Sequence, residues 1–159
     1  MDEGTVVTFN SRAELETHFL DCVSRSRALL QLFDPDFAVF PLGSIDADAA
    51  LRHFLRQGGH IELAAHRSSH IERSYPRFLR LLKDYSDRIA CRFTPRSLQQ
   101  LTDSFCIGDG VHIVRRFHSD HMHGEAAFDA PASTEISRER FTGIWQESLP
   151  GLHPTVTGL

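Results

Sequence analysis

The chain has 159 residues, of which 41% are hydrophobic and 24% are charged. This is the length of one domain and the composition of a globular protein, so the disordered, collagen-like and fibrous classes are excluded. The formal net charge of −4 argues against nucleic-acid binding through bulk charge, and no apolar run is long enough to span a membrane. We therefore expect neither a nucleic acid nor a membrane as partner.

The cysteines and the basic residues bear on compartment and ligand. Cys22, Cys91 and Cys106 are odd in number and show no C-x-x-C spacing, which predicts reduced thiols. Residues 1–20 lack the basic-then-apolar layout of a signal peptide, so we expect a cytoplasmic protein. Lys83 is the only lysine among 17 basic residues. The arginines that make up the rest present a bidentate fork that suits planar anions.

Strands and helices alternate along the first half of the chain. Ser11 and Glu14 have capping-box spacing and predict a helix start, and Asp46 is the expected N-cap of the next helix. The run LLQLF is apolar on both faces, as in a buried central strand. The predicted elements are, in order, a strand over 5–9, a helix over 11–25, a strand over 29–33, a helix over 47–57 and a strand over 60–65.

The second half of the chain continues this alternation and adds a hairpin. Ser74 and Ser137 are candidate N-caps, and Asp109-Gly110 between apolar runs is a strong hairpin signal. The predicted elements are a helix over 75–86, a strand over 88–93, a short helix after Thr94-Pro95, strands over 104–108 and 111–117, a polar loop over 118–137 and a helix over 138–147. This order predicts an α/β domain over 1–150 with a mixed, mostly parallel sheet and helices on both faces, followed by a tail over 151–159.

The element order and several sequence landmarks resemble one half of a phospholipase D-like protein. The landmarks are a strand ending at Asp34, the run Gly-Gly-His-Ile-Glu-Leu at the start of another strand, and a strand-turn-strand around Asp109. The phrases LFDPDF, FPLG, DSF and VRRFH also resemble a bacterial family of such domains, which are sometimes joined to a GNAT-type acetyltransferase domain. The resemblance covers about residues 5–147 and implies a phospholipase D-like fold.

The signature of that family, H-x-K-x4-D, is broken in this chain. Asp109 matches the aspartate, but Thr102 stands at the histidine position and Ser104 at the lysine position. In the family the histidine attacks phosphorus, and the lysine stabilises the equatorial oxygens. Thr102 cannot replace an imidazole nucleophile without an activating base, and Ser104 brings no positive charge. The resemblance thus implies the fold and argues against the family's reaction.

Charged side chains follow the predicted strands at the edge where α/β sheets bind ligands. Alternation along residues 112–118 places an arginine and a histidine on one face, and this pair suits phosphate or carboxylate. An alternative is that Arg116 pairs with Asp34 or Asp36 to hold the fold together. The predicted ligand-binding residues are Asp34, His66, Arg67, Arg116 and His118.

A second candidate is a metal site in the loop that follows the last predicted strand. His118, Asp120, His121 and His123 lie within six residues, and imidazole and carboxylate groups bind zinc, nickel or copper. Ordering one flexible loop around a metal costs entropy, so we expect no physiological cofactor and only adventitious divalent metal.

These observations favour a non-catalytic phospholipase D-like module. We expect it to form a homodimer and to bind a protein partner or a phosphate-containing small molecule. Two alternatives stay open. One is a phosphodiesterase-like hydrolase that uses a relocated histidine, His118 or His66. The other is a metal-binding protein that uses the loop from His118 to His123.

Overall fold

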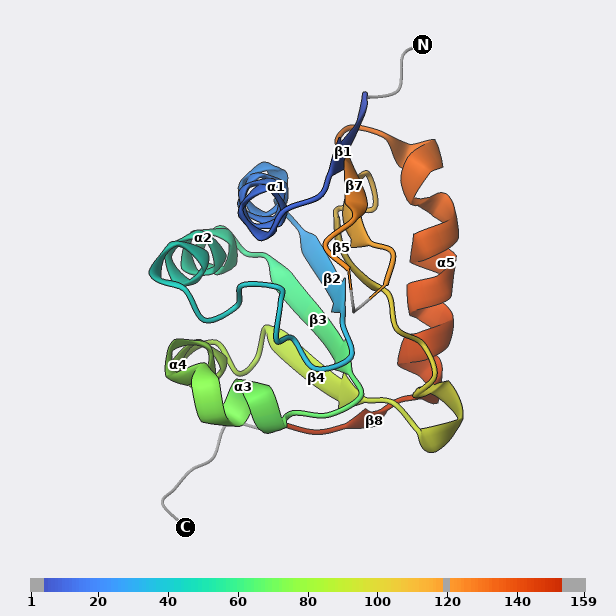
Figure 1. Cartoon of the computed structure of the whole chain (residues 1–159). Coiled ribbons are helices and arrows are strands. Elements are labelled where there is room, and N and C mark those ends of the chain that lie inside the picture. The colour runs from blue at the N-terminus through green and yellow to red at the C-terminus, as the bar shows by residue number, and fades with distance from the viewer. Residues whose placement is uncertain (1–4, 119–120, 153–159) are drawn as a thin grey trace.

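An eight-stranded sheet forms the centre of the part of the chain that the computed structural model describes, residues 5–118 and 121–152 (Figure 1). Its strands are β1 (Val6–Phe9), β2 (Leu29–Phe33), β3 (His60–Ala65), β4 (Ile89–Phe93), β5 (Ser104–Gly108), β6 (His112–Arg116), β7 (Gly124–Ala127) and β8 (Leu149–Pro150). They lie in the order β1-β7-β6-β5-β2-β3-β4-β8.

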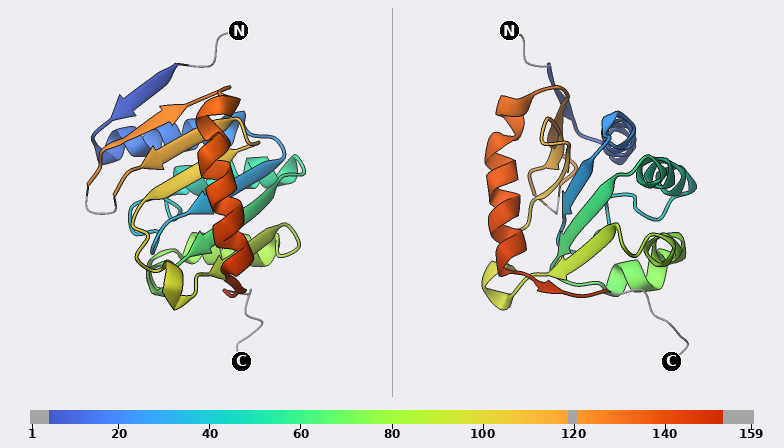
Figure 2. Two further views of the ribbon diagram at one scale, coloured as in Figure 1. Left: turned by 90° about the vertical axis from the view of Figure 1, so that its right-hand side faces the viewer. Right: turned by 180° about the vertical axis from the view of Figure 1, so that it is seen from behind.

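Helices cover both faces of this sheet (Figures 1 and 2). They are α1 (Arg12–Arg25), α2 (Ile45–Arg56), α3 (Ser69–Ser74), α4 (Pro76–Asp84) and α5 (Pro131–Glu147), with a 3-10 turn, η1 (Arg96–Leu98). The first four helices lie on one face, and α5 crosses the other alone. No helix within the described residues has the length and hydropathy needed to cross a membrane.

The pairing of the strands confirms a mixed α/β sheet, but its parallel part is smaller than the sequence predicted. Only β2 with β3 and β3 with β4 pair in parallel among the described strands. β5, β6, β7 and β1 continue the sheet by antiparallel pairing, and β8 pairs antiparallel with β4. The difference arises because β5, β6 and β7 follow one another as an antiparallel meander, for which short connections suffice, while β8 returns after α5 to the edge of β4.

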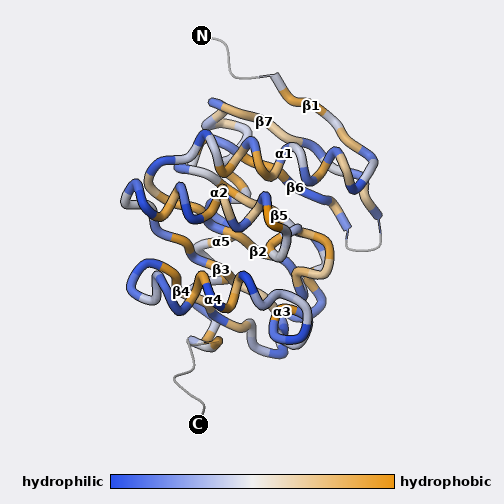
Figure 3. The backbone as a smooth tube through the Cα atoms, turned by 90° about the vertical axis from the view of Figure 1, so that its left-hand side faces the viewer, coloured by the Kyte–Doolittle hydropathy of each residue, from blue (hydrophilic) through white to orange (hydrophobic). Residues whose placement is uncertain are grey.

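The two faces of the sheet bury two separate groups of apolar side chains. Along β2, Leu30 and Leu32 belong to the larger core beneath α1, α2 and α4, whereas Phe33 belongs to the smaller core beneath α5. This follows from the alternation of side chains along a strand. In Figure 3, hydrophilic and hydrophobic stretches follow one another along α1, α2 and α4, the pattern of amphipathic helices with one face on the core.

The predicted polar loop over 118–137 is wrong from residue 124 onward. β7 lies within it, paired on both sides by β1 and β6, and α5 starts at Pro131 rather than after Ser137. The four residues of β7, GEAA, carry little intrinsic strand preference, so only their neighbours define the strand. Proline fits the first helical position, which explains the earlier start of α5.

Two predicted N-caps also differ, while the first is confirmed. The Ser11 side chain accepts a hydrogen bond from the backbone N–H of Glu14, as predicted. For α2 the N-cap is Ser44, which accepts from Ala47 N at 3.0 Å, and the predicted cap lies in the first turn. Ser74 is the last residue of α3, a helix that the sequence did not predict.

The last described residues continue the strand pairing beyond residue 150. Gly151 donates its backbone N–H to the Cys91 carbonyl at 3.0 Å. Leu152 packs against the larger core. The remainder of the predicted tail, 153–159, lies outside the described residues.

Candidate functional site

The end of β2 is organised by one buried carboxylate, that of Asp34, which has no exposed surface. Pro35 follows it and disfavours helical geometry at Asp34. The Oδ2 atom of Asp34 accepts hydrogen bonds from the backbone N–H groups of Asp36, at 3.0 Å, and Phe37, at 2.5 Å. These bonds close a tight turn in which Phe37 adopts a φ of 60°, a conformation that few non-glycine residues take.

The second oxygen of this carboxylate binds an arginine and a serine from the neighbouring strands. Oδ1 accepts hydrogen bonds from the Ser104 hydroxyl and from Nη2 of Arg116, the latter at 3.0 Å. Because β2 and β5 pair with Phe33 opposite Phe105, Ser104 falls next to Asp34. The side chain of Arg116 is 2% exposed. The ion pair that the sequence left open as a structural alternative is therefore present.

Opposing effects act on the acidity of this group. Burial raises the pKa of Asp34 above its usual value, because an apolar interior disfavours the charged form. The Ser104 hydroxyl, two backbone amides and the Arg116 charge act in the opposite direction. The ionised carboxylate thus depends on its partners, and removal of Arg116 would leave a buried group without a counter-charge.

His66, at the end of β3, has both ring nitrogens in hydrogen bonds. Nδ1 lies 2.6 Å from the Thr94 hydroxyl and Nε2 lies 2.7 Å from the carbonyl oxygen of Leu101. Because a carbonyl oxygen only accepts, Nε2 carries a hydrogen and donates it. The ring is 6% exposed. It joins the ends of β3 and β4 to the segment before β5, so neither nitrogen is free to take a proton from a substrate.

A cavity of about 280 Å³ lies at these strand ends, and we call it the strand-end cavity. Its walls bring together three residues that the sequence predicted, His66, Arg67 and Arg116. Arg67 is exposed, and its guanidinium makes no hydrogen bond or ion pair with the described residues. Asp34 lies behind Arg116, and His118 is absent from the lining. The other polar groups in its walls include Asp36, Gln99 and Thr102.

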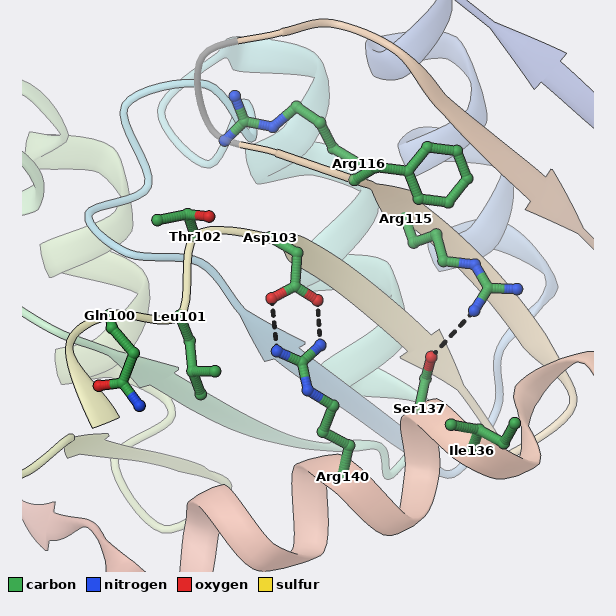
Figure 4. Close-up of a pocket in the computed structure, with 10 residues that line it drawn as sticks. Gln100, Leu101, Thr102, Asp103, Arg115, Arg116, Ile136, Ser137 and Arg140 are labelled. Atoms are coloured by element: carbon green, nitrogen blue, oxygen red, sulfur yellow. Dashed lines mark hydrogen bonds and ion pairs between the residues drawn. The ribbon is translucent and has the colours of Figure 1, made fainter. Parts of the chain in front are cut away.

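A second cavity, of about 380 Å³, lies on the α5 side of the segment before β5 (Figure 4). We call it the α5 cavity. Asp103 and Arg140 form a two-bonded ion pair at its floor, and this pairing raises the pKa of Arg140. Arg115 donates to the Ser137 hydroxyl at 3.3 Å and also pairs with Glu125 at 2.6 Å. Leu101, Thr102 and Arg116 line both cavities, so the segment 101–102 is a shared wall.

Asp109, which matches the aspartate of the resembled motif, serves the backbone. Its carboxylate accepts three hydrogen bonds, from the N–H groups of Arg27 at 2.8 Å, Ala28 at 2.8 Å and Leu29 at 2.9 Å. Burial acts to raise the pKa of Asp109, but these three donors and the nearby His112 lower it below its usual value. Asp109 therefore fixes the start of β2 against the β5–β6 turn.

The predicted metal loop contributes to no cluster of metal-ligating side chains among the described residues. No group of three or more histidine, cysteine, aspartate or glutamate side chains is placed there to hold a metal ion. The rings of His118 and His121 lie 5.8 Å apart between centroids, and Asp120 lies outside the described residues. The metal-binding hypothesis thus stays a prediction.

The three thiols are buried and do not enter either cavity. Burial raises the pKa of Cys91 to about 12. The pKa of Cys106 is raised by its hydrogen bond with Cys22 and by burial. A thiolate is the reactive form of cysteine, so Cys91 and Cys106 lack the environment of a nucleophile.

Several residues of this region escaped sequence reasoning. In the sequence Ser104 stands out only as a replacement for lysine; its position opposite Asp34 follows from the β2–β5 register. Thr94 stands out only as the residue after a strand, and the Asp103–Arg140 pair gives no local signal because 37 residues separate its members. The strand-end rule placed His66, Arg67 and Arg116 at one cavity, but it did not predict which of them are already bonded.

Comparison with known proteins places the chain in a family. A domain of unknown function, DUF7931, matches residues 11–153. The chain belongs to the DUF7931 family. No curated protein matches this DUF7931 chain.

The solved structures that are similar to the DUF7931 chain belong to proteins with different functions. Nuc, a phospholipase D family member from Salmonella typhimurium, has a TM-score of 0.67 and 14% identity over 94% of this chain and 99% of its own. TrmBL2, an archaeal chromatin protein described with a novel mode of DNA binding, has a TM-score of 0.70 and 9% identity. This chain is covered to 94% and spans about half of TrmBL2, 54%.

A third similar structure is phosphatidylserine synthase from Haemophilus influenzae Rd KW20. Its TM-score is 0.64 and its identity 11%, over 95% of this chain and 40% of the synthase. At these identities the likenesses establish the fold alone. The DUF7931 chain has a phospholipase D-like fold, as its resemblance to that family implied.

Proposed function

We propose that this domain is a non-catalytic phospholipase D-like module whose strand-end cavity binds a phosphate-containing small molecule. The observation that carries the proposal is the guanidinium of Arg67 at the cavity, without a hydrogen bond or ion pair to the described residues. Arginine presents paired donors that match a phosphate group. Arg116, whose Nη2 is bonded to Asp34 and Ser104, adds a second positive charge to the cavity wall.

The carboxylate of Asp36 refines the class of ligand. Its Oδ1 accepts a hydrogen bond from the backbone N–H of Ala38 at 3.0 Å, and the side chain lines the cavity beside Arg67. A carboxylate repels a bare anion and accepts hydrogen bonds from hydroxyl or amino groups. We therefore expect a ligand that carries such donors next to its phosphate.

The absence of catalysis rests on the bonds that the polar groups already make. Ser104, at the position of the family's lysine, donates to Asp34. His66, the histidine nearest to Thr102 in the cavity wall, has both nitrogens engaged. A hydroxyl nucleophile at Thr102 would need a free base within hydrogen-bond reach.

Replacement of Arg67 by alanine tests the binding site. Isothermal titration calorimetry with glycerol 3-phosphate, a phosphomonoester with hydroxyl groups, should show binding to the wild type and a loss of about 10-fold to 100-fold in R67A, because hydrogen bonds to charged groups contribute about 1.5–3 kcal/mol. Arg96→Ala is the matched control, since Arg96 is exposed on η1 and does not line the cavity. Equal affinities of wild type and R67A would contradict the proposal.

A phosphodiesterase assay separates this proposal from the hydrolase alternative. With bis(p-nitrophenyl) phosphate, with and without divalent metal, we expect no release of p-nitrophenol above the rate in buffer. His118→Ala and His66→Ala should leave that background unchanged. Turnover that is lost in either variant would show a relocated catalytic histidine and reject the non-catalytic assignment.

A further inference from the structure

Basic side chains are concentrated in one stretch of this acidic chain. Residues 66–83 contain five of the 17 cationic side chains and one of the 21 carboxylates. Four of those cations are exposed on α3 and α4, and we call them the α3–α4 patch. The patch consists of Arg73, Arg77, Arg80 and Lys83.

None of these four cations forms an ion pair with a carboxylate of the described residues. The one acid of α4, Asp84, pairs instead with Arg52 of α2 at 2.9 Å. Glu72, the acid of α3, accepts a hydrogen bond from the Ser68 hydroxyl at 2.7 Å. Asp84 is therefore paired outside the patch, and residues 66–83, with five cations and the single carboxylate of Glu72, keep an excess of positive charge.

The arrangement of the patch on α4 disfavours folding. Arg77 occupies the second position of the helix, directly after Pro76, and the first turn contains no acid. A cation there opposes the positive end of the helix dipole. Arg77, Arg80 and Lys83 are spaced three apart on the exposed face, where like charges repel. Arg73 donates to the Ser69 carbonyl at 3.3 Å and Arg77 to the Gly43 carbonyl at 3.4 Å, but these contacts leave the repulsion among the cations uncompensated, whereas binding of a polyanion would compensate it.

The surroundings of the patch distinguish among polyanions. The exposed large apolar side chains are Val6, Val7, Ile45, Phe117, Ile136 and Leu149, all outside residues 66–84. The patch thus lacks the apolar centre of a protein interface and the apolar anchors of a membrane-binding helix. Tyr75, between α3 and α4, is buried and offers no ring on which a base could stack.

The geometry points to the α3–α4 patch as a binding surface for the phosphate backbone of double-stranded nucleic acid, without base-specific contacts. Bulk charge argued against nucleic acid, but backbone binding depends on local cations that replace counterions. The inference does not rest on the proposed ligand of the strand-end cavity, because Arg67 is not part of the patch.

Fluorescence anisotropy of the full chain with a fluorescein-labelled 20-base-pair DNA duplex at low salt tests this surface. The triple variant R77Q/R80Q/K83Q should bind at least about tenfold more weakly than the wild type. The negative slope of log K against log salt concentration should become less steep by about 2–3. Glutamine keeps a helix preference close to that of arginine and lysine.

The matched control removes the same charge from other helices. Arg56 of α2, Arg96 of η1 and Arg138 of α5 are exposed and have no carboxylate partner among the described residues. R56Q/R96Q/R138Q should retain affinity within about threefold. Equal weakening by the control would overturn the inference, because it would reduce the effect to net charge.

Four further readouts separate the surface from its alternatives. The thermal midpoint of R77Q/R80Q/K83Q should stay level or rise, and a fall would assign the patch a structural role and overturn the inference. Equal competition by poly-L-glutamate of matched length, or tighter binding to phosphatidylserine-containing vesicles than to DNA, would overturn it in favour of a protein or a membrane. R67A should leave duplex binding unchanged, so the two proposals fail independently.

Discussion

Replacing Arg116 with methionine is expected to lower the free energy of unfolding by about 3–5 kcal/mol, the range for a buried ion pair that loses one partner. The reason is that Asp34 has no exposed surface and Arg116 is its only cationic partner among the described ion pairs. Methionine fills much of the volume of the arginine stem, so the loss measures the charge rather than a void. Urea unfolding followed by circular dichroism gives the value.

Arg115, the residue next to Arg116, and Asp34, its ion-pair partner, provide the controls. Arg115→Met removes a partly exposed pair with Glu125 and should cost about 1 kcal/mol or less. The double variant D34N/R116M should be more stable than R116M alone, because no uncompensated charge remains buried. If R116M and R115M have the same free energy of unfolding, the buried Asp34–Arg116 pair does not stabilise the fold more than the partly exposed Arg115–Glu125 pair.

The free energy of unfolding of R116M should also depend on pH in a characteristic way. Burial raises the pKa of Asp34, and R116M removes one of the effects that oppose it. A carboxyl whose pKa is higher in the folded than in the unfolded state contributes stability below the unfolded value and loses it as pH rises through the folded value. The deficit of R116M relative to wild type should therefore shrink in acid and grow toward neutral pH. The stability of D34N/R116M should itself contain no contribution from the titration of residue 34.

Replacing Asp109 with asparagine is expected to cost about 2–3 kcal/mol, since a charged acceptor of three backbone N–H groups becomes a neutral amide. Asp109 has a φ of 52°, and asparagine tolerates this left-handed conformation, so backbone strain does not contribute. Asp129→Asn is the control, because Asp129 shares that φ but has a side chain 78% exposed. A loss in D109N no larger than in D129N would contradict the role assigned to Asp109.

The pH dependence of D109N has the opposite sign. The pKa of Asp109 is lowered in the folded chain, so its contribution is complete above the unfolded value near 3.8 and is lost as pH falls through the lower folded value. Wild type and D109N should therefore converge in stability in strong acid. Guanidinium unfolding at a series of pH values between 2 and 6 measures this convergence.

The sequence predicted those elements whose own residues carry the pattern. LLQLF at β2 and the capping box at α1 were placed within a residue or two, because apolar period and caps are local signals. β7 was missed because GEAA is a strand only through its neighbours, and β8 has two residues and a proline. β7 and β8 are strands because they pair with neighbouring strands, and their own residues have little preference for that conformation.

The candidate site divides in the same way. Strand-end reasoning brought His66, Arg67 and Arg116 to one cavity, since the carboxyl ends of neighbouring strands meet at one edge. It could not assign their bonds, because Thr94 lies 28 residues from His66 and Asp34 lies 82 residues from Arg116 along the chain. The registers of β2 with β5 and of β5 with β6 bring Ser104 and Arg116 next to Asp34.

The wall shared by the two cavities has a thermodynamic consequence. Leu101 and Thr102 line both, and the wall is tied on one side by His66 and on the other by the Asp103–Arg140 pair. A ligand that displaces this wall in one cavity also reshapes the other. In that case we expect the two cavities to be thermodynamically linked: a first ligand that changes the affinity for the second by some factor has its own affinity changed by the same factor.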